Sequence, residues 1–385
     1  MNHTPFAGSR SQVSVALAGV GSYLPEQRVS NRTMLERINP RHPDGTPFAP
    51  DWIERHVGIF ERRLDFDFAA GRKRERSEGG LFDGDLALRA ARAALADARV
   101  DAGAVDILVH VSTTPDTIAC VDHLRFLTTE LGLRRGADLV HHNLGCAGLA
   151  AGLRTASAFL RSWAPATALV VASNCPSGYF AKEAGGAYRS HASGFAWLSP
   201  LVFSDGAGAV VLRSAVPSAG DRRAGLLAVR YETSPDVALV TYPAGGCLNH
   251  TSVDNVGDHL FIMDGRRVNE VFAPLMQRNM EMLKEDWPTD IAPVLGAGFD
   301  PDRVARWYMH QANGVVVRRA GELLGLPADR IPINVDRYGN TSAASTLILL
   351  REDREANRVR EGDLVVFLWI GAGNGAMNGY AALIL

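Results

Sequence analysis

Short apolar runs alternate with longer, alanine-rich segments along the whole chain. Runs in the first half that have the length and apolar character of buried strands are Val13–Gly21, Asp106–Val111, Asp138–Asn143 and Ala168–Ser173. Between them, Asp85–Ala98 predicts a helix capped by its aspartate, and Cys146–Arg161 predicts another helix. VFSDGAGAVVL, Val202–Leu212, predicts two strands around a glycine turn. This alternation is typical of an α/β protein with buried sheets.

The second half repeats the order of the first. Four pairs of segments correspond at a nearly constant offset, and they are Val105–His110 with Ala305–His310, Leu139–Cys146 with Ile331–Asn340, Ala168–Ser173 with Leu364–Ile370, and GAVVL with the closing GYAALIL. Single parallels of this kind arise by chance in any α/β protein. Four in register favour an internal duplication, with halves at residues 1–222 and 223–385.

Two stretches interrupt this order. Glu61–Gly80 contains RKRERSEGG, a charge run that we interpret as a solvated loop rather than a binding patch. Pro235–Asp258 is rich in Gly, Pro, Asn and Asp, and loops of that length often form lids or pocket walls.

Composition and charge narrow the classes of function. The 385 residues are 46% hydrophobic and 21% charged, with a formal net charge of −2, which argues against nucleic acid as a partner. No apolar run reaches the ~20 residues of a membrane helix, and MNHTPFAGSRSQ does not resemble a secretory signal. The four cysteines, Cys120, Cys146, Cys175 and Cys247, include no CxxC pair. We therefore expect no disulfide framework, no metal site and a reducing, cytoplasmic setting.

Three motifs far apart in the sequence each follow a predicted strand and carry one reactive side chain. They are GCAGL with Cys146, HQAN with His310 and YGNTSAAS with Asn340. Taken singly, each has a structural alternative: a small buried cysteine, a core histidine, a turn asparagine. Together they suggest thioester chemistry, with a thiol nucleophile and two neutral donors for one carbonyl oxygen. Cys146 is placed near a helix N-terminus, so we expect the pKa of its thiol to be lowered.

An ordered set of motifs resembles the β-ketoacyl-acyl-carrier-protein synthase III family of thiolase-fold condensing enzymes. The set is GVGSYLPEQRVSN from Gly19, DWIERHVGIFERR, the cysteine motif, FSDGAGAVVL, HQAN, YGNTSAAS and GAGNGA, and it spans nearly the whole chain. The resemblance implies a duplicated, five-layered αβαβα fold, with the cysteine in the first half and the histidine and asparagine in the second. It also implies a homodimer without a metal or redox cofactor. GVGS is not a dinucleotide fingerprint, because it lacks the third glycine and meets Pro25 where a helix should start.

The resemblance also implies a mechanism. Cys146 would be acylated by an acyl-CoA or acyl-carrier-protein thioester, and His310 and Asn340 would bind the thioester carbonyl of a malonyl-type extender. Decarboxylation would then give an enolate that attacks the acyl group in a Claisen condensation. The backbone amides of Cys146 and Gly373 would form the oxyanion hole.

Other positions bear on the substrate. Trp52 matches the tryptophan that flanks the adenine of coenzyme A in the family, whereas His56 and Trp197 stand where arginines are usual. Val315 and Glu322 replace basic residues associated with carrier-protein docking, which weakens the case for the housekeeping carrier protein and favours secondary, polyketide-like or fatty-acid-like metabolism. Further candidate contacts are Cys120 at the end of the acyl pocket and Arg266 and Asn313 against coenzyme A or pantetheine, although core packing for Cys120 and a solvated surface role for Arg266 are alternatives.

Alternative functions remain. One is a related acyltransferase that passes the acyl group to a hydroxyl or amine, although retention of both His310 and Asn340 favours condensation. Another is head-to-head condensation of two acyl chains, which needs a carboxylate base such as Glu183 or Asp116. A third is an inactive partner subunit, against which the intact trio argues. A metal site at His110, His141 and His142 ranks low, because adjacent residues of a strand point to opposite faces.

Overall fold

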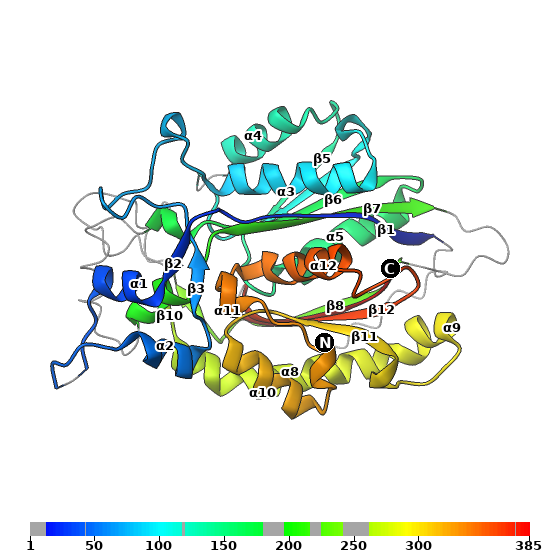
Figure 1. The fold of residues 1–385 in the computed structure, drawn as a ribbon. Coiled ribbons are helices and arrows are strands. Elements are labelled where there is room, and N and C mark those ends of the chain that lie inside the picture. The colour runs from blue at the N-terminus through cyan, green and yellow to red at the C-terminus, as the bar shows by residue number, and fades with distance from the viewer. Residues whose placement is uncertain are drawn as a thin grey trace.

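Two β-sheets stacked between helices form five layers in the computed structural model, which describes residues 13–42, 44–117, 120–179, 196–215, 225–241, 262–373 and 375–385 (Figure 1). Helices cover the outer face of each sheet, and α5 and α12 lie between the sheets, so the predicted αβαβα architecture is confirmed. No helix in the described ranges is both long enough and apolar enough to span a bilayer.

The first sheet has the strand order β1-β7-β6-β4-β5. Its strands are β1 (Ser14–Tyr23), β4 (Ile107–Val111), β5 (Asp138–His142), β6 (Thr167–Asn174) and β7 (Gly206–Ala215). The prediction of two strands in Val202–Leu212 is wrong, because β7 is one continuous strand preceded by α7 (Ser199–Val202). Its glycines serve close packing instead of a turn: a Cβ at Gly208 would lie 2.6 Å from the Cβ of Leu347 in α12.

The second sheet repeats this order as β8-β13-β12-β11. Its strands are β8 (Gly225–Ser234), β11 (Val304–Met309), β12 (Leu364–Gly373) and β13 (Gly375–Ile384). The strand predicted within Ile331–Asn340 is absent: residues 331–334 are irregular and α11 (Val335–Tyr338) follows. Gln311 explains this, since its Oε1 accepts from the backbone N–H groups of Asn334 (3.1 Å) and Val335 (3.3 Å), which a strand neighbour would otherwise use. The predicted boundary at residue 222 lies outside the described residues.

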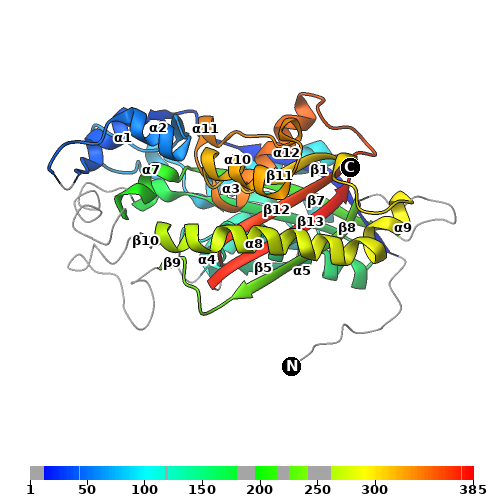
Figure 2. The same ribbon diagram turned by 90° about the horizontal axis from the view of Figure 1, so that it is seen from below.

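Helices complete the layers, as Figures 1 and 2 show from two sides. The longer ones are α3 (Asp83–Ala98) and α4 (Val121–Leu131) outside the first sheet, α5 (Gly148–Ser162) and α12 (Ser345–Glu355) in the centre, and α8 (Gly265–Asp286) and α10 (Gly314–Leu324) outside the second. Helix α3 begins two residues before the predicted Asp85, whose side chain accepts from the Phe82 N–H (2.9 Å). In GVGS, a Cβ at Gly21 would collide with the Ala90 carbonyl, so this motif brings β1 against α3.

Shorter elements form a cap over one end of the sheets. They are β2 (Arg28–Ser30), α1 (Asn31–Ile38), α2 (Pro50–Val57), β3 (Glu61–Arg63), α7, and the pair β9 (Val240–Thr241) and β10 (Ile262–Met263), while α9 (Ala292–Leu295) lies elsewhere, after α8. An apolar cluster of the cap includes Ile53, Phe66, Trp197 and Phe203, and Cys146 packs against it. The cap thus supplies an apolar wall beside the cysteine.

The charge run in Glu61–Gly80 is only partly the solvated loop that we predicted. The side chain of Lys73 is 9% exposed, and its Nζ donates to Ser177 Oγ (2.5 Å) and to the Asp65 carbonyl (3.0 Å). The carboxylates of Asp65 and Asp205 each lie 3.7 Å from the same nitrogen. Lys73 therefore neutralises a buried pair of acids and fastens this segment to the sheet end.

Candidate active site

Cys146 lies in the turn between β5 and α5, two residues before the helix begins at Gly148. The turn packs against the end of β12: a Cβ at Gly371 would clash with the Cβ of Cys146, and a Cβ at Gly145 would lie 3.0 Å from the Ala372 carbonyl. The Cys146 side chain is half-buried against the apolar cluster of the cap. The glycines on both sides of the contact set the depth of the thiol.

Burial raises the pKa of the Cys146 thiol, so the predicted lowering is wrong. Hydrogen bonds from the side chains of Ser342 and Asn340 and from the Ala372 backbone act in the opposite direction without reversing the shift. Placing a thiolate against apolar side chains costs more solvation free energy than these hydrogen bonds and the helix N-terminus contribute in stabilisation. The thiol form is the resting state at neutral pH.

Asn340 follows α11 and is fixed by its backbone between two residues of the cap. Its N–H donates to the Val202 carbonyl (2.9 Å), and its carbonyl accepts from the Ser204 N–H (2.9 Å). Its side chain is 3% exposed, and Oδ1 accepts from the Ser342 N–H (2.8 Å). This bond sets the orientation of the amide, so its NH₂ group is the part that acts on Cys146.

His310 comes directly after β11, where its N–H donates to the Leu368 carbonyl (2.8 Å). Burial lowers the pKa of the imidazole to about 4, so the ring is neutral at pH 7. Its Nδ1 lies 3.1 Å from Ser345 Oγ, which also accepts from the Gln311 N–H (3.3 Å). Because that hydroxyl oxygen accepts from an amide, its own hydrogen is free to go to Nδ1. We infer that the ring proton is on Nε2.

Ser342 joins the three predicted residues, and sequence reasoning missed it. Its Oγ donates to Cys146 Sγ (3.6 Å), its N–H donates to Asn340 Oδ1 (2.8 Å), and its backbone raises the pKa of His310 against the effect of burial. Its φ is +55°, a left-handed conformation that non-glycine residues adopt at a cost. The sequence signal is the run of small residues after Asn340 in YGNTSAAS.

The structure places the predicted oxyanion-hole residues at the same end of β12. Gly373 is the last residue of that strand and pairs with Gly375 of β13, one residue after the Ala372 backbone that interacts with the thiol. The role of the Cys146 and Gly373 amides in binding an oxyanion stays a prediction.

The predicted adenine-binding residues meet in an aromatic group on the cap. The Trp52 ring stacks on His56 (centroids 4.5 Å apart), and Trp197 lies 5.9 Å from Trp52 and 4.5 Å from Phe48. His56 Nδ1 lies 2.8 Å from the Trp52 carbonyl, one turn back in α2. The structure thus brings Trp52, His56 and Trp197 together, on the same cluster that borders Cys146.

The remaining candidates have local partners. Arg266 is exposed on α8 and pairs with Glu270 (3.1 Å), and Asn313 caps α10 by accepting from the Val316 N–H (2.7 Å). Cys120 is half-buried just before α4, with φ +59°. These contacts give Arg266 and Asn313 structural roles, and their contact with a substrate stays a prediction.

The chain is similar to known proteins over nearly its whole length. Residues 296–383 match the family model described as 3-oxoacyl-[acyl-carrier-protein (ACP)] synthase III C terminal. The β-ketoacyl-[acyl-carrier-protein] synthase III of Rhodospirillum rubrum is 32% identical over 358 residues, 93% of this chain and 95% of that protein. The enzyme of the same name from Bradyrhizobium diazoefficiens is 29% identical over 94% of this chain and 97% of its own.

Solved structures agree with this similarity. The 3-oxoacyl-(acyl carrier protein) synthase III, FabH, of Pseudomonas aeruginosa PAO1 has a TM-score of 0.73 and 26% identity, with 96% of this chain and 98% of that chain covered. OleA of Xanthomonas campestris has a TM-score of 0.74 at 19% identity, with 97% and 98% covered. At that identity, the likeness to OleA concerns the fold alone.

Proposed function

Since the chain belongs to the β-ketoacyl-[acyl-carrier-protein] synthase III family, we propose that it forms an acyl thioester on Cys146 and condenses it with a malonyl-type thioester. The observation that carries this proposal is the convergence of Cys146, His310 and Asn340 on Ser342. The product would be a β-ketoacyl thioester, and no metal or redox cofactor is needed for these steps.

Acylation exchanges one thioester for another. The sulfur of Cys146 attacks the acyl carbonyl, the coenzyme A or carrier thiol leaves, and the cysteine proton passes to that leaving thiolate. The raised pKa of Cys146 keeps the resting enzyme in the unreactive thiol form. Hydrogen bonding from Ser342 and Asn340 favours the thiolate when it forms, and we propose that the backbone amides of Cys146 and Gly373 bind the developing oxyanion.

Condensation requires that the extender be activated without a charged acid. His310 is neutral at pH 7 and carries its proton on Nε2, and the orientation of Asn340 directs its NH₂ group toward the thiol. Two neutral donors on one thioester oxygen stabilise the enolate that decarboxylation leaves. The enolate carbon then attacks the acyl carbonyl on Cys146, and the cysteine leaves as a thiolate.

Intact-protein mass spectrometry after incubation with a panel of acyl-CoAs tests the first step. We expect an acyl adduct on the wild type and on Cys175→Ala, which removes a buried cysteine elsewhere in the structure, and none on Cys146→Ala. An adduct that persists in Cys146→Ala contradicts the proposal. Carbon dioxide release from malonyl-CoA by the acylated enzyme, and its loss in His310→Ala, tests the second step.

The same experiment separates the alternatives. Transfer to a hydroxyl or amine would consume the acyl adduct without malonyl-CoA and without carbon dioxide. Head-to-head condensation would consume two acyl-CoAs and needs a base. Asp116 does not present a free carboxylate for that role, because it accepts from the Gly84 N–H (3.1 Å) and pairs with Arg76, while Glu183 lies outside the described residues.

The aromatic group of Trp52, His56 and Trp197 is proposed to hold the adenine of coenzyme A. Loss of one stacking partner typically costs about 0.5–1.5 kcal/mol, or roughly 2- to 12-fold in KM for an acyl-CoA. Trp52→Ala should therefore raise KM for acyl-CoA but leave a truncated acyl-pantetheine thioester unaffected. Trp163→Ala, which removes a 68% exposed tryptophan at the end of α5, is the matched control. An equal loss with both thioesters would contradict adenine binding at Trp52.

Two interaction surfaces follow from family membership. Edge strand β5 pairs only with β4 among the described strands, and we propose that its open edge joins a second copy in a homodimer, which sedimentation analysis tests.

On α10, exposed Val315 and Glu322 replace the basic residues expected for carrier docking, although Arg318 and Arg319 are exposed on the same helix. We propose coenzyme A delivery of the acyl group and a role in secondary metabolism. A lower KM for acyl-carrier-protein than for acyl-CoA would contradict the first of these.

A further inference from the structure

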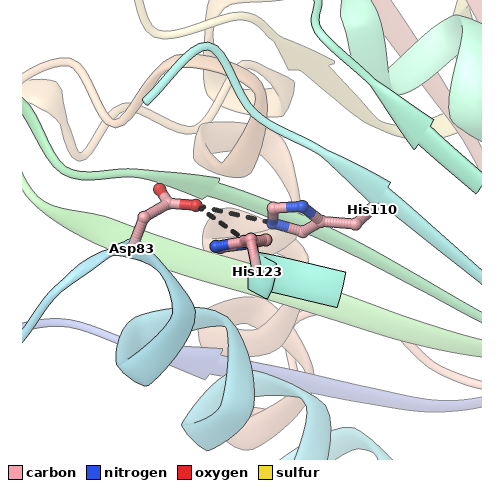
Figure 3. A group of neighbouring side chains, drawn as sticks. All are labelled: Asp83, His110 and His123. Carbon is pink, nitrogen blue, oxygen red and sulfur yellow. Dashed lines mark ion pairs between the residues drawn. The ribbon is translucent and has the colours of Figure 1, made fainter. Parts of the chain in front are cut away.

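A buried group of histidines and one aspartate lies on the face of the first sheet that α3 and α4 cover (Figure 3). Asp83 is the first residue of α3, His110 lies in β4 and His123 lies in the first turn of α4. All three side chains are at most 1% exposed. His141 of the neighbouring strand β5 contacts His110, with 3.0 Å between their Nδ1 atoms.

The three buried residues present one ligand atom each to a common point. Asp83 Oδ2 lies 3.6 Å from His110 Nε2 and 3.7 Å from His123 Nε2, and all three atoms lie within 4.8 Å of one another. In a tetrahedral site with metal–ligand bonds of about 2.0–2.1 Å, ligand atoms lie about 3.3–3.4 Å apart. The group therefore needs to contract by only a few tenths of an ångström along the two measured edges.

One of the three ligand atoms makes no hydrogen bond to the described residues. His123 Nε2 is buried and has no hydrogen-bond partner within the described part of the chain, although buried polar atoms are nearly always paired. It points at Asp83, as Figure 3 shows. A buried nitrogen aimed at a carboxylate from beyond hydrogen-bonding distance is the arrangement that a bound cation would complete.

The second ring nitrogens have partners suited to metal-bound imidazoles. His123 Nδ1 lies 3.7 Å from Asp116 Oδ2, and His110 Nδ1 lies 3.0 Å from His141 Nδ1. With protons on both Nδ1 atoms, each Nε2 would be left with a lone pair, His141 would accept from His110, and the Asp116 carboxylate would face the His123 Nδ1–H. Without metal, His123 Nδ1 accepts from the Asp116 N–H (3.2 Å) instead, so metal binding would shift the His123 proton from Nε2 to Nδ1.

We propose that Asp83, His110 and His123 bind one divalent transition-metal ion, with Zn²⁺ as the best match to a donor set of two imidazoles and one carboxylate. In the absence of metal, Ser173 Oγ bridges two of these ligand atoms, at 2.7 Å from His110 Nε2 and 2.8 Å from Asp83 Oδ2, so binding of the ion would replace these two hydrogen bonds. The ion would tie α3, α4 and β4 together. Because α4 begins directly after Cys120, the ion would also fix the position of that residue.

This site is separate from Cys146 and does not depend on the proposed condensing activity. It departs from the sequence-based expectation of no metal, which rested on the cysteine spacing and on His110, His141 and His142. The argument about opposite faces is correct, since His142 Nε2 lies 2.9 Å from Thr155 Oγ1 on α5 while His141 contacts His110. Asp83 and His123 were overlooked because helices far apart in the sequence bring them to β4.

The test uses the full chain, freed of metal by a chelator and titrated with Zn²⁺ and with Co²⁺. We expect one ion per chain, the intense visible absorption of tetrahedral Co²⁺, and a higher melting temperature with Zn²⁺. His142→Gln, which removes the adjacent histidine on the other face, should retain all three. His123→Gln should lose the stoichiometric site.

A milder variant keeps the proposal testable where His123→Gln does not fold. Asp116→Asn replaces the carboxylate that faces His123 Nδ1 with a neutral amide and should weaken Zn²⁺ binding ~10–100-fold, the usual effect of losing an outer-sphere partner. The proposal is overturned by a wild type that binds no ion or only octahedral Co²⁺. It is also overturned by equal Zn²⁺ affinity in the wild type and folded His123→Gln.

Discussion

Replacing Ser342 with alanine tests whether its hydroxyl controls the pKa and the reactivity of the Cys146 thiol. The change removes the donor to Cys146 Sγ (3.6 Å) but leaves the N–H that holds Asn340 Oδ1 (2.8 Å). Because that hydroxyl favours the thiolate, its loss should raise the pKa of Cys146 above its already raised value.

The magnitude follows from the contact. A net hydrogen bond contributes about 0.5–1.5 kcal/mol, and one pKa unit corresponds to about 1.36 kcal/mol. Ser342→Ala should therefore raise the pKa of the thiol further, by the free energy of one net hydrogen bond. Thiolate nucleophilicity rises with pKa at a Brønsted slope of about 0.4–0.5, which offsets nearly half of the loss of thiolate. The net reaction with a disulfide should slow roughly 2- to 4-fold below the pKa.

The assay is the pH dependence of the reaction of Cys146 with an aromatic disulfide reagent, with modification measured by mass spectrometry on the peptide that contains it. Ser345→Ala is the matched control, because its hydroxyl contacts His310 Nδ1 rather than the thiol. Ser342→Gly should slow the reaction of the Cys146 thiol as much as Ser342→Ala does. Because glycine adopts the left-handed backbone at φ +55° without strain, the Ser342→Gly protein should unfold at a higher temperature than the Ser342→Ala protein.

Two results would refute this reasoning. One is a titration of Cys146 in Ser342→Ala that matches the wild type, which would mean that burial alone sets the thiol pKa. The other is an equal shift in Ser345→Ala, which would mean that the effect comes through His310 or through general loosening of the segment.

Three further predictions concern the same framework. The pKa of His310 is about 4 in the folded chain and near 6.5 in the unfolded chain, so between these pH values the unfolded chain binds one more proton. The free energy of unfolding should therefore fall by about 3 kcal/mol as the pH is lowered from 6.5 to 4. Denaturant titrations should show a smaller fall for His310→Gln. Gly371→Ala should displace Cys146 and abolish acylation, whereas Gly298→Ala, with no atom near its added Cβ, should be neutral in the mass-spectrometric assay. Lys73→Met leaves the buried Asp205 without a cation, while Asp65 keeps its pair with Arg74, and should lower the unfolding free energy by about 3–5 kcal/mol. A change below about 1 kcal/mol would contradict the buried network.

Elements set by local pattern were predicted well. The strands β1, β4, β5 and β6 and helix α5 match their predicted ranges within two residues, because their signals are continuous apolar runs and glycine or alanine periodicity. The wrong predictions of secondary structure lie where contacts with residues distant in the sequence determine the local conformation. Gln311 takes the backbone donors of Asn334 and Val335, and α12 packs on the glycines of β7.

The sequence by itself determined the fold class and the family, and it predicted the trio of Cys146, His310 and Asn340, because each motif carries its chemistry within a few residues. Only the tertiary structure decided the sign of the thiol pKa shift, the part of Ser342 and the meeting of Asp83 with His110 and His123. The physical reason is the same in each case. Desolvation and hydrogen bonding depend on which groups surround an atom, and here those groups come from segments tens to hundreds of residues away.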